Sequence, residues 1–212
     1  MNTEFFTTSR IAGILLLLSL VLILGAAGLI AAQGRLAGMA AAFRGVGPGT
    51  GDASGLHTMG RAAIPYMMAQ LAGYALFALL LHQAGDRGMA VVALTLFVFS
   101  ATFAAVEGSF HANVTVWAAE EAGRTGAAPA FYEPLRRWAN GEVQLVYMSF
   151  LLTALLLFSW SALRTGLLAP WIGWAALAWS LLSFPLYFLI FGAPLIVIVT
   201  PLLFGIGLLL HG

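Results

Sequence analysis

The stretch IAGILLLLSLVLILGAAGLIAA, residues 11 to 32, decides the class of this protein. It contains no charged residue and exceeds the roughly 20 residues that an α-helix needs to cross the hydrocarbon core of a bilayer. A secretory signal peptide has a shorter apolar core, of about 7 to 15 residues. The stretch therefore predicts a membrane-spanning helix that stays in the mature protein.

The composition of the whole chain leads to the same class. The chain has 212 residues, of which 61% are hydrophobic and 8% are charged, with a mean hydropathy of +0.97. A soluble domain carries roughly 25% charged residues, which it needs to cover a surface that faces water. This composition excludes a soluble globular enzyme, a disordered chain and a nucleic-acid-binding protein. The absence of cysteine and lysine also excludes disulfides, thiol chemistry and Schiff bases.

Five more stretches are long and apolar enough to cross a membrane. With the first, the expected spans are residues 11–32, 62–81, 89–117, 143–163, 171–191 and 194–210. The predicted fold is therefore all-α, a polytopic integral membrane bundle of six transmembrane helices that forms a single domain over residues 1–212. Six spans place both termini on one side of the membrane and the two long loops, 33–61 and 118–142, on the opposite side.

Several short motifs resemble a known family. They are the opening Arg10-Ile11-Ala12-Gly13, the Val106-Glu107 step followed by Asn113, the run from Ser161 to Gly173, and the Leu-rich helix that ends in His211-Gly212. Together they resemble an uncharacterised bacterial six-span membrane family, catalogued as domain of unknown function 4386, over nearly the whole chain. That family usually has Arg after the proline at position 170, where this chain has Trp171. The resemblance implies the architecture and no activity, and we expect the chain in a bacterial inner (plasma) membrane.

Glu107 and His111 are the clearest candidates for a functional role. An ionisable side chain near the centre of a membrane costs about 2.5–3.5 kcal/mol or more, so its presence needs an explanation. The two residues are four apart and share one face of a helix. At 1.5 Å per residue, Glu107 lies roughly 27 Å beyond Met89, which places the pair near one edge of the hydrocarbon.

The predicted topology brings other polar residues to the same edge. Glu142 opens the fourth span beside Asn140 and Gln144, and Tyr187 lies late in the fifth span. We therefore expect one pocket at the edge of one leaflet, with ligand-binding candidates Glu107, His111, Glu142, Arg61, His57 and Tyr187.

Three interpretations of this polar cluster remain open from the sequence. In the first, it only fixes the packing of the helices, through an ion pair of Glu107 with Arg61 and a bond from His111 to Glu142 or to a carbonyl. In the second, it binds a ligand or handles protons. In the third, Glu107, His111 and Glu142 bind a divalent metal that activates water, although their spacing is not the His-Glu-x-x-His pattern of zinc proteases.

The favoured prediction is a small multi-pass membrane protein without catalytic activity and without a cofactor. It would bind a lipid-like ligand or a larger membrane complex through the polar cluster. Its expected partners are membrane lipids, other membrane subunits or a second copy of the chain, and no nucleic acid. The alternative is a membrane-embedded hydrolase that depends on a divalent metal.

Overall fold

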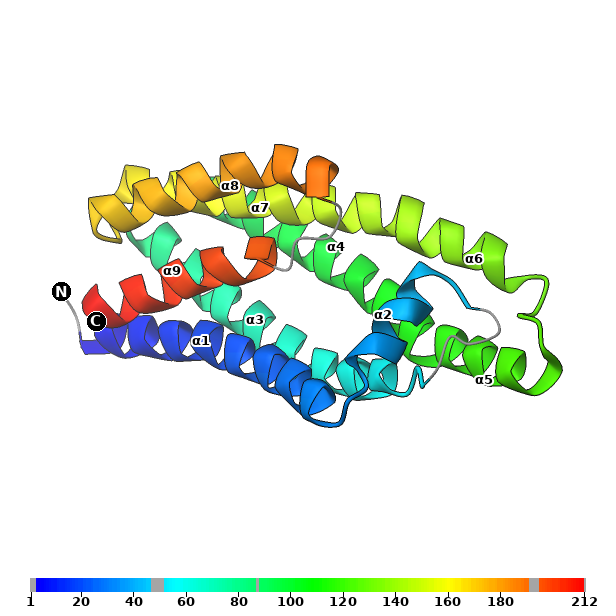
Figure 1. Cartoon of the computed structure of the whole chain (residues 1–212). Helices are drawn as coiled ribbons and strands as arrows, with labels where there is room; N and C mark the ends of the chain where they lie inside the picture. The colour runs from blue at the N-terminus through cyan, green and yellow to red at the C-terminus, as the bar shows by residue number, and fades with distance from the viewer. Residues whose placement is uncertain (1–2, 47–51, 87, 191–194, 212) are drawn as a thin grey trace. The chain divides into compact units, whose positions relative to one another are not determined.

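The computed structural model describes residues 3–46, 52–86, 88–190 and 195–211, and these residues form helices and short connections without any strand (Figure 1). Two segments, η1 and η2, are π-helical. The elements are α1 (Thr3–Ala32), α2 (Leu36–Arg44), α3 (Gly55–Gln83), α4 (Met89–Ser109), η1 (Phe110–Thr115), α5 (Val116–Thr125), α6 (Tyr132–Trp138), η2 (Ala139–Val143), α7 (Gln144–Thr165), α8 (Pro170–Ile190) and α9 (Leu195–His211).

Four helical stretches are long and apolar enough to cross a membrane. They are Thr3–Ala32, Gly55–Gln83, Met89–Thr125 and Tyr132–Thr165, and they contain the first four expected spans. The prediction of an all-helical fold is thus confirmed for the described residues, and four of its helices have the length and composition of membrane spans. Helices α8 and α9 occupy the fifth and sixth expected spans, and the number six stays a prediction. Residues 191–194, where we expect those two spans to meet, lie outside the described residues.

The described residues of the two stretches expected as long loops are largely helical, which corrects the prediction. The stretch Met89–Thr125 has 37 residues, so it is about 55 Å long where the hydrocarbon core is about 30 Å thick. Alanine and glutamate in the stretch VWAAEEAGRT favour helix, and Glu121 forms an ion pair with Arg124 one turn later, at 2.7 Å. Gly126 then ends the helix, with a φ of +83° that suits glycine.

The chain divides into two compact units. The first comprises Met1–Leu20, Met67–Ala101 and Met148–Gly212, and the second comprises Val21–Tyr66 and Thr102–Tyr147. Most of the charged residues fall in the second unit, whereas helices α8 and α9 belong entirely to the first.

An aromatic cluster forms the core of the first unit. Tyr74 is fully buried, and its ring centroid lies 4.4 Å from that of Phe97 and 5.1 Å from that of Phe158. Phe204 of α9 packs on Phe77 with 4.7 Å between the ring centroids. The core therefore joins α3, α4, α7 and α9 through large rings.

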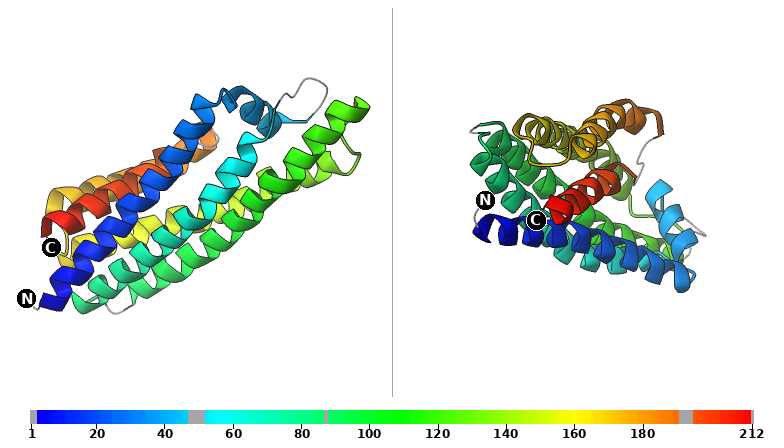
Figure 2. Two further views of the ribbon diagram at one scale, coloured as in Figure 1. Left: turned by 90° about the horizontal axis from the view of Figure 1, so that it is seen from below. Right: turned by 90° about the vertical axis from the view of Figure 1, so that its left-hand side faces the viewer.

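Helix α9 lies alongside α1 in the first unit (Figure 1, Figure 2). The two backbones approach closely at Gly13 and Gly205. A Cβ atom on Gly13 would lie only 2.9 Å from the carbonyl oxygen of Gly205, so a larger residue does not fit there. The buried Ser9 hydroxyl donates a hydrogen bond of 2.9 Å to the carbonyl of Leu208. Small residues and a hydroxyl at a helix contact are typical of helices that associate within a membrane.

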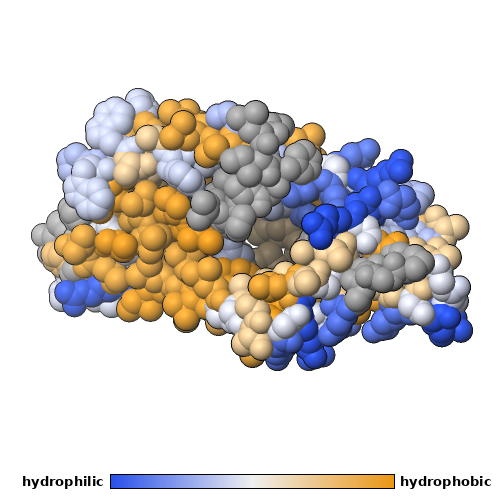
Figure 3. All heavy atoms as spheres, viewed as in Figure 1, coloured by the Kyte–Doolittle hydropathy of each residue, from blue (hydrophilic) through white to orange (hydrophobic). Residues whose placement is uncertain are grey.

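The surface of the first unit suits a lipid environment. Figure 3 shows that the surface over α1 and α9 is mostly hydrophobic. Trp160, Trp171 and Trp174 are 44%, 61% and 60% exposed, as expected of an aromatic belt at a membrane boundary.

The connection between α3 and α4 is held by Asp86. One carboxylate oxygen accepts hydrogen bonds from the backbone N–H of Gly88 (3.2 Å) and of Met89 (3.0 Å), and the other accepts one from the Ser161 hydroxyl. Burial alone would raise the pKa of Asp86. The three hydrogen bonds and the charge of Arg164 outweigh burial and hold the pKa below its usual value of 3.8.

Replacing Asp86 should therefore change stability in a way that depends on pH. Because the folded-state pKa is lowered, the stabilisation is complete above the unfolded-state pKa and is lost as the pH falls through the folded-state pKa. We expect Asp86→Ala to lower the free energy of unfolding by about 1 kcal/mol at neutral pH, with a smaller loss in acid. Unfolding of both proteins in mild detergent, at pH 7 and at the lowest pH at which they stay folded, measures this loss of stability. An equal loss at both pH values would rule out the charge of Asp86 as the cause.

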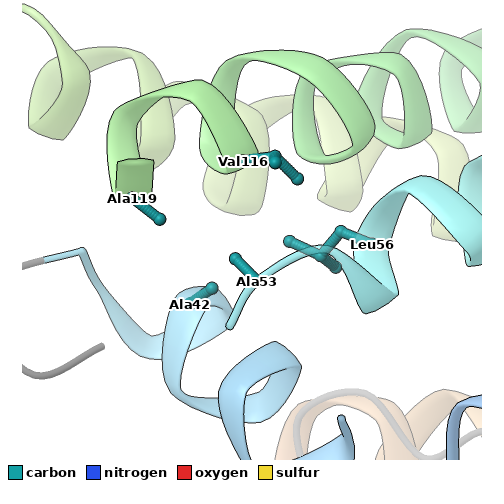
Figure 4. Close-up of a cluster of buried hydrophobic side chains, with 5 residues drawn as sticks. All are labelled: Ala42, Ala53, Leu56, Val116 and Ala119. Atoms are coloured by element: carbon teal, nitrogen blue, oxygen red, sulfur yellow. The ribbon is translucent and has the colours of Figure 1, made fainter. Parts of the chain in front are cut away.

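The second unit packs through small residues. Figure 4 shows Ala42 of α2, Ala53, Leu56 of α3, and Val116 and Ala119 of α5 facing one another in a buried cluster. Arg35 and Asp52 form an ion pair of 3.2 Å at the two ends of the segment that carries α2. Hydrophilic residues gather over α2, α5 and α6 on the face seen in Figure 3.

Candidate functional site

Two π-helical segments mark the polar part of the second unit. Segment η1 carries His111, and segment η2 carries Asn140. A π-helical turn is rare and has a poorer fit to the backbone hydrogen-bond ladder than an α-helix, and such turns occur often at functional sites. Here each π-helical segment presents a polar side chain toward the other.

A chain of four side chains joins η1, η2 and α6. His111 Nε2 lies 2.8 Å from Asn140 Oδ1, and His111 Nδ1 lies 3.2 Å from Thr115 Oγ1. The Tyr132 hydroxyl donates to Thr115 Oγ1 at 3.3 Å. One neutral tautomer satisfies the whole chain: Nε2–H donates to Asn140, and Nδ1 accepts from the Thr115 hydroxyl. We call these four residues the His111 chain.

His111, Thr115 and Tyr132 are buried, whereas Asn140 is half-buried. His111 is 4% exposed, and Tyr132 is 1% exposed. The rings of Phe110 and Tyr132 stack with centroids 6.1 Å apart and an interplanar angle of 8°. Both ring nitrogens of His111 therefore have partners in a buried setting, which suits a role in fixing the two π-helical segments.

Glu107 lies one helical turn before η1 and has a different environment. Its side chain is half-buried, and its carboxylate forms neither a hydrogen bond nor an ion pair with any residue that the structure describes. A carboxylate in this position is expensive to keep in a membrane unless something compensates for its lost hydration. Glu107 is therefore a half-buried ionisable residue whose charge no described residue compensates.

The remaining predicted site residues are not members of the His111 chain. His57, Arg61 and Glu142 are exposed in the second unit. The expected ion pair of Glu107 with Arg61 is not formed among the described residues, and His111 binds Asn140 and Thr115 instead of Glu142. Tyr187 belongs to α8 of the first unit, where it is buried.

The predicted metal ligands do not converge. Within residues 3–46, 52–86, 88–190 and 195–211, no three His, Asp or Glu side chains are grouped in a way that could hold a metal ion. His111 has both ring nitrogens bonded to protein groups, and Glu142 is exposed. The structure therefore gives no support to a metal site on Glu107, His111 and Glu142.

Ion pairs and aromatic side chains surround the His111 chain. Glu133 binds both Arg136 (2.8 Å) and Arg137 (2.9 Å) along α6. The exposed rings of Trp117 and Phe131 stack with centroids 5.6 Å apart. Arginine and tryptophan together are typical of segments at the level of lipid headgroups.

Thr115 and Tyr132 belong to the His111 chain, but the sequence predicts no role for either residue. Thr115 follows His111 by four residues, a spacing that could have indicated a contact on one helix face. Tyr132 carries no such signal, because it contacts Thr115 across a turn and a change of helix.

Comparisons with family models, curated proteins and solved structures gave no match to this chain. The resemblance to the six-span family stays a prediction.

Proposed function

We propose that this protein is a non-catalytic, six-span protein of a bacterial inner membrane that binds a lipid-like molecule at Glu107. The observation that carries the proposal is the half-buried carboxylate of Glu107 without a partner among the described residues. In this account the His111 chain holds the adjacent π-helical segment in place, so that Glu107 is presented to the ligand.

The energetics of the carboxylate favour a ligand with a polar head. A hydrogen bond to a charged group contributes about 1.5–3 kcal/mol, comparable to the cost of placing the carboxylate in the membrane. A head group that donates hydrogen bonds or carries positive charge would supply this compensation. The ligand's tail would then lie among the apolar side chains that the spans present to lipid.

The bonding of His111 favours binding over catalysis. A metal-bound histidine uses one ring nitrogen for the metal and the other for a supporting partner. A general base also needs a nitrogen that can reach its substrate. In this protein Asn140 and Thr115 occupy both nitrogens, which supports a positioning role for His111.

A lipid titration tests the proposal with Glu107→Gln, which keeps the shape of the side chain and removes its charge. A ligand present at about 100 times its Kd stabilises a protein by about 2.7 kcal/mol, or about 5 to 10 °C in Tm for a chain of this size. We expect mixed phosphatidylethanolamine, phosphatidylglycerol and cardiolipin, added to protein in mild detergent, to give such a shift. Most of the shift should be lost in Glu107→Gln.

The matched control is Glu120→Gln, which removes an exposed carboxylate from the same continuous helical stretch. This variant should keep the full shift. Equal shifts in all three proteins would argue against lipid binding at Glu107 and would favour contact with another membrane subunit.

A further inference from the structure

The first unit contains a large cavity between the first turns of α1 and the C-terminal end of α3. Its volume is about 680 Å³, within the range of small-molecule binding sites. Its polar lining includes Glu4, Thr7, Thr8 and Gln83, and Phe5 and Leu79 contribute apolar surface. Figure 2 shows the start of α1 beside the end of α3.

The polar lining offers hydrogen-bond acceptors beside the donors of Thr3 and Gln83. The Thr7 hydroxyl donates to the carbonyl of Thr3 at 3.0 Å, and the Thr8 hydroxyl donates to the carbonyl of Glu4 at 2.8 Å. Their hydrogens are thereby used, and their oxygens keep lone pairs that can accept. The Glu4 carboxylate accepts only, and none of the residues that line the cavity is basic.

This lining complements an ammonium group. A primary ammonium has three N–H donors and no acceptor, and it pairs with a carboxylate through hydrogen bonds strengthened by charge. A quaternary ammonium has the same charge but no N–H to donate. The acceptors of the cavity therefore distinguish the two kinds of head group.

The apolar lining extends the match to an amphiphile. Phe5 and Leu79 border the cavity, and Leu79 is 45% exposed. Farther along α1, Ile11, Ile14 and Leu18 are 46%, 55% and 43% exposed, which provides a path for a hydrocarbon chain. A hydrated metal ion would make no use of these surfaces.

We propose that this cavity binds the primary ammonium head group of an amphiphile, of the aminophospholipid class, with Glu4 as its counter-ion. The site lies in the first unit and uses none of the residues of the Glu107 site in the second unit.

Native mass spectrometry of the full chain tests the site with a matched pair of lipids. Phosphatidylethanolamine and phosphatidylcholine with identical acyl chains differ only in the three N-methyl groups. We expect the wild-type protein to retain phosphatidylethanolamine about tenfold better, the difference that about 1.4 kcal/mol of hydrogen bonding produces. Glu4→Gln should reduce this ratio to about one, and Leu79→Trp, which fills the cavity, should lower retention of the lipid itself.

Two controls identify the site and the source of the ammonium. Glu120→Gln should keep the tenfold ratio. If Glu107→Gln abolishes the ratio and Glu4→Gln keeps it, the ammonium binds at Glu107, and the cavity proposal is wrong while the proposed function stands. Soluble glycerophosphoethanolamine competes with phosphatidylethanolamine only if the head group can bind from water. If it does not compete, the ammonium group comes from a membrane lipid. The cavity proposal holds in both cases. Equal retention of the two lipids by the wild type, or an unchanged ratio in Glu4→Gln, overturns it.

Discussion

Phe158→Ala should lower the free energy of unfolding by about 3 to 5 kcal/mol, the largest effect that we expect from a single substitution. Phe158 is fully buried, and its ring lies 5.1 Å from that of Tyr74 and 5.7 Å from that of Phe77. Detergent or lipid tails are as apolar as the core, so the loss comes mainly from packing contacts that no solvent molecule replaces. Denaturant unfolding in mild detergent measures it.

The control for this prediction is Phe99→Ala. Phe99 also contacts another ring, that of Phe150 at 5.8 Å, but it is 51% exposed. Its removal leaves a gap that detergent can fill, and we expect a loss of about 1 kcal/mol or less. If the two variants lost the same stability, the aromatic cluster would not be the core of the first unit.

His111→Ala should have the second largest effect, a loss of about 2 to 4 kcal/mol. The substitution removes a buried ring and its hydrogen bonds to the half-buried Asn140 and the buried Thr115, and losing the partner of a buried polar group costs about 1–3 kcal/mol. We also expect faster amide hydrogen exchange in η1 and η2, because His111 joins these two segments.

His57→Ala is the matched control for this loss. His57 is an exposed histidine of the same unit, and its removal should change stability by less than about 0.5 kcal/mol. Unchanged stability and exchange in His111→Ala would contradict a structural role for the His111 chain. A stoichiometric metal found in the wild-type protein and lost from His111→Ala would instead favour the metal-dependent hydrolase.

Much of the fold is predictable from the sequence, because a span is defined by local composition. The run from Ile11 to Ala32 needs no partner to be recognised, and the structure places helix α1 over it. Residues 118–142 are polar and predict a loop, whereas helix α5 continues to Thr125. Helix propensity does not depend on burial, so a helix can continue beyond the hydrocarbon when its residues favour it.

The pairing within the site is less predictable, because it depends on rotation about helix axes. Asn140 and Glu142 are two residues apart, so they lie on nearly opposite faces of a helix, and sequence position alone does not tell which one meets His111. The π-helical turns add to this difficulty, since they shift the register without a recognisable sequence pattern. Glu107 precedes His111 by four residues on one continuous helical stretch, which sequence spacing alone predicts.

The charge distribution gives the two units different roles in this account. The second unit holds most of the charged residues, the His111 chain and Glu107, while the first holds the aromatic core and the cavity beside Glu4. The long helical stretch Met89–Thr125 contributes to both units. We infer that the second unit contains the boundary between hydrocarbon and water, where a polar head group and an apolar tail can be bound together.

Counting the lipids that remain bound after delipidation tests the central claim most directly. Native mass spectrometry of the wild type, Glu107→Gln and Glu120→Gln, purified in the same mild detergent, gives this number for each chain. The account predicts that Glu107→Gln retains one lipid-like molecule fewer than the wild type, and that Glu120→Gln retains the same number. The same number of bound molecules in all three proteins would contradict it.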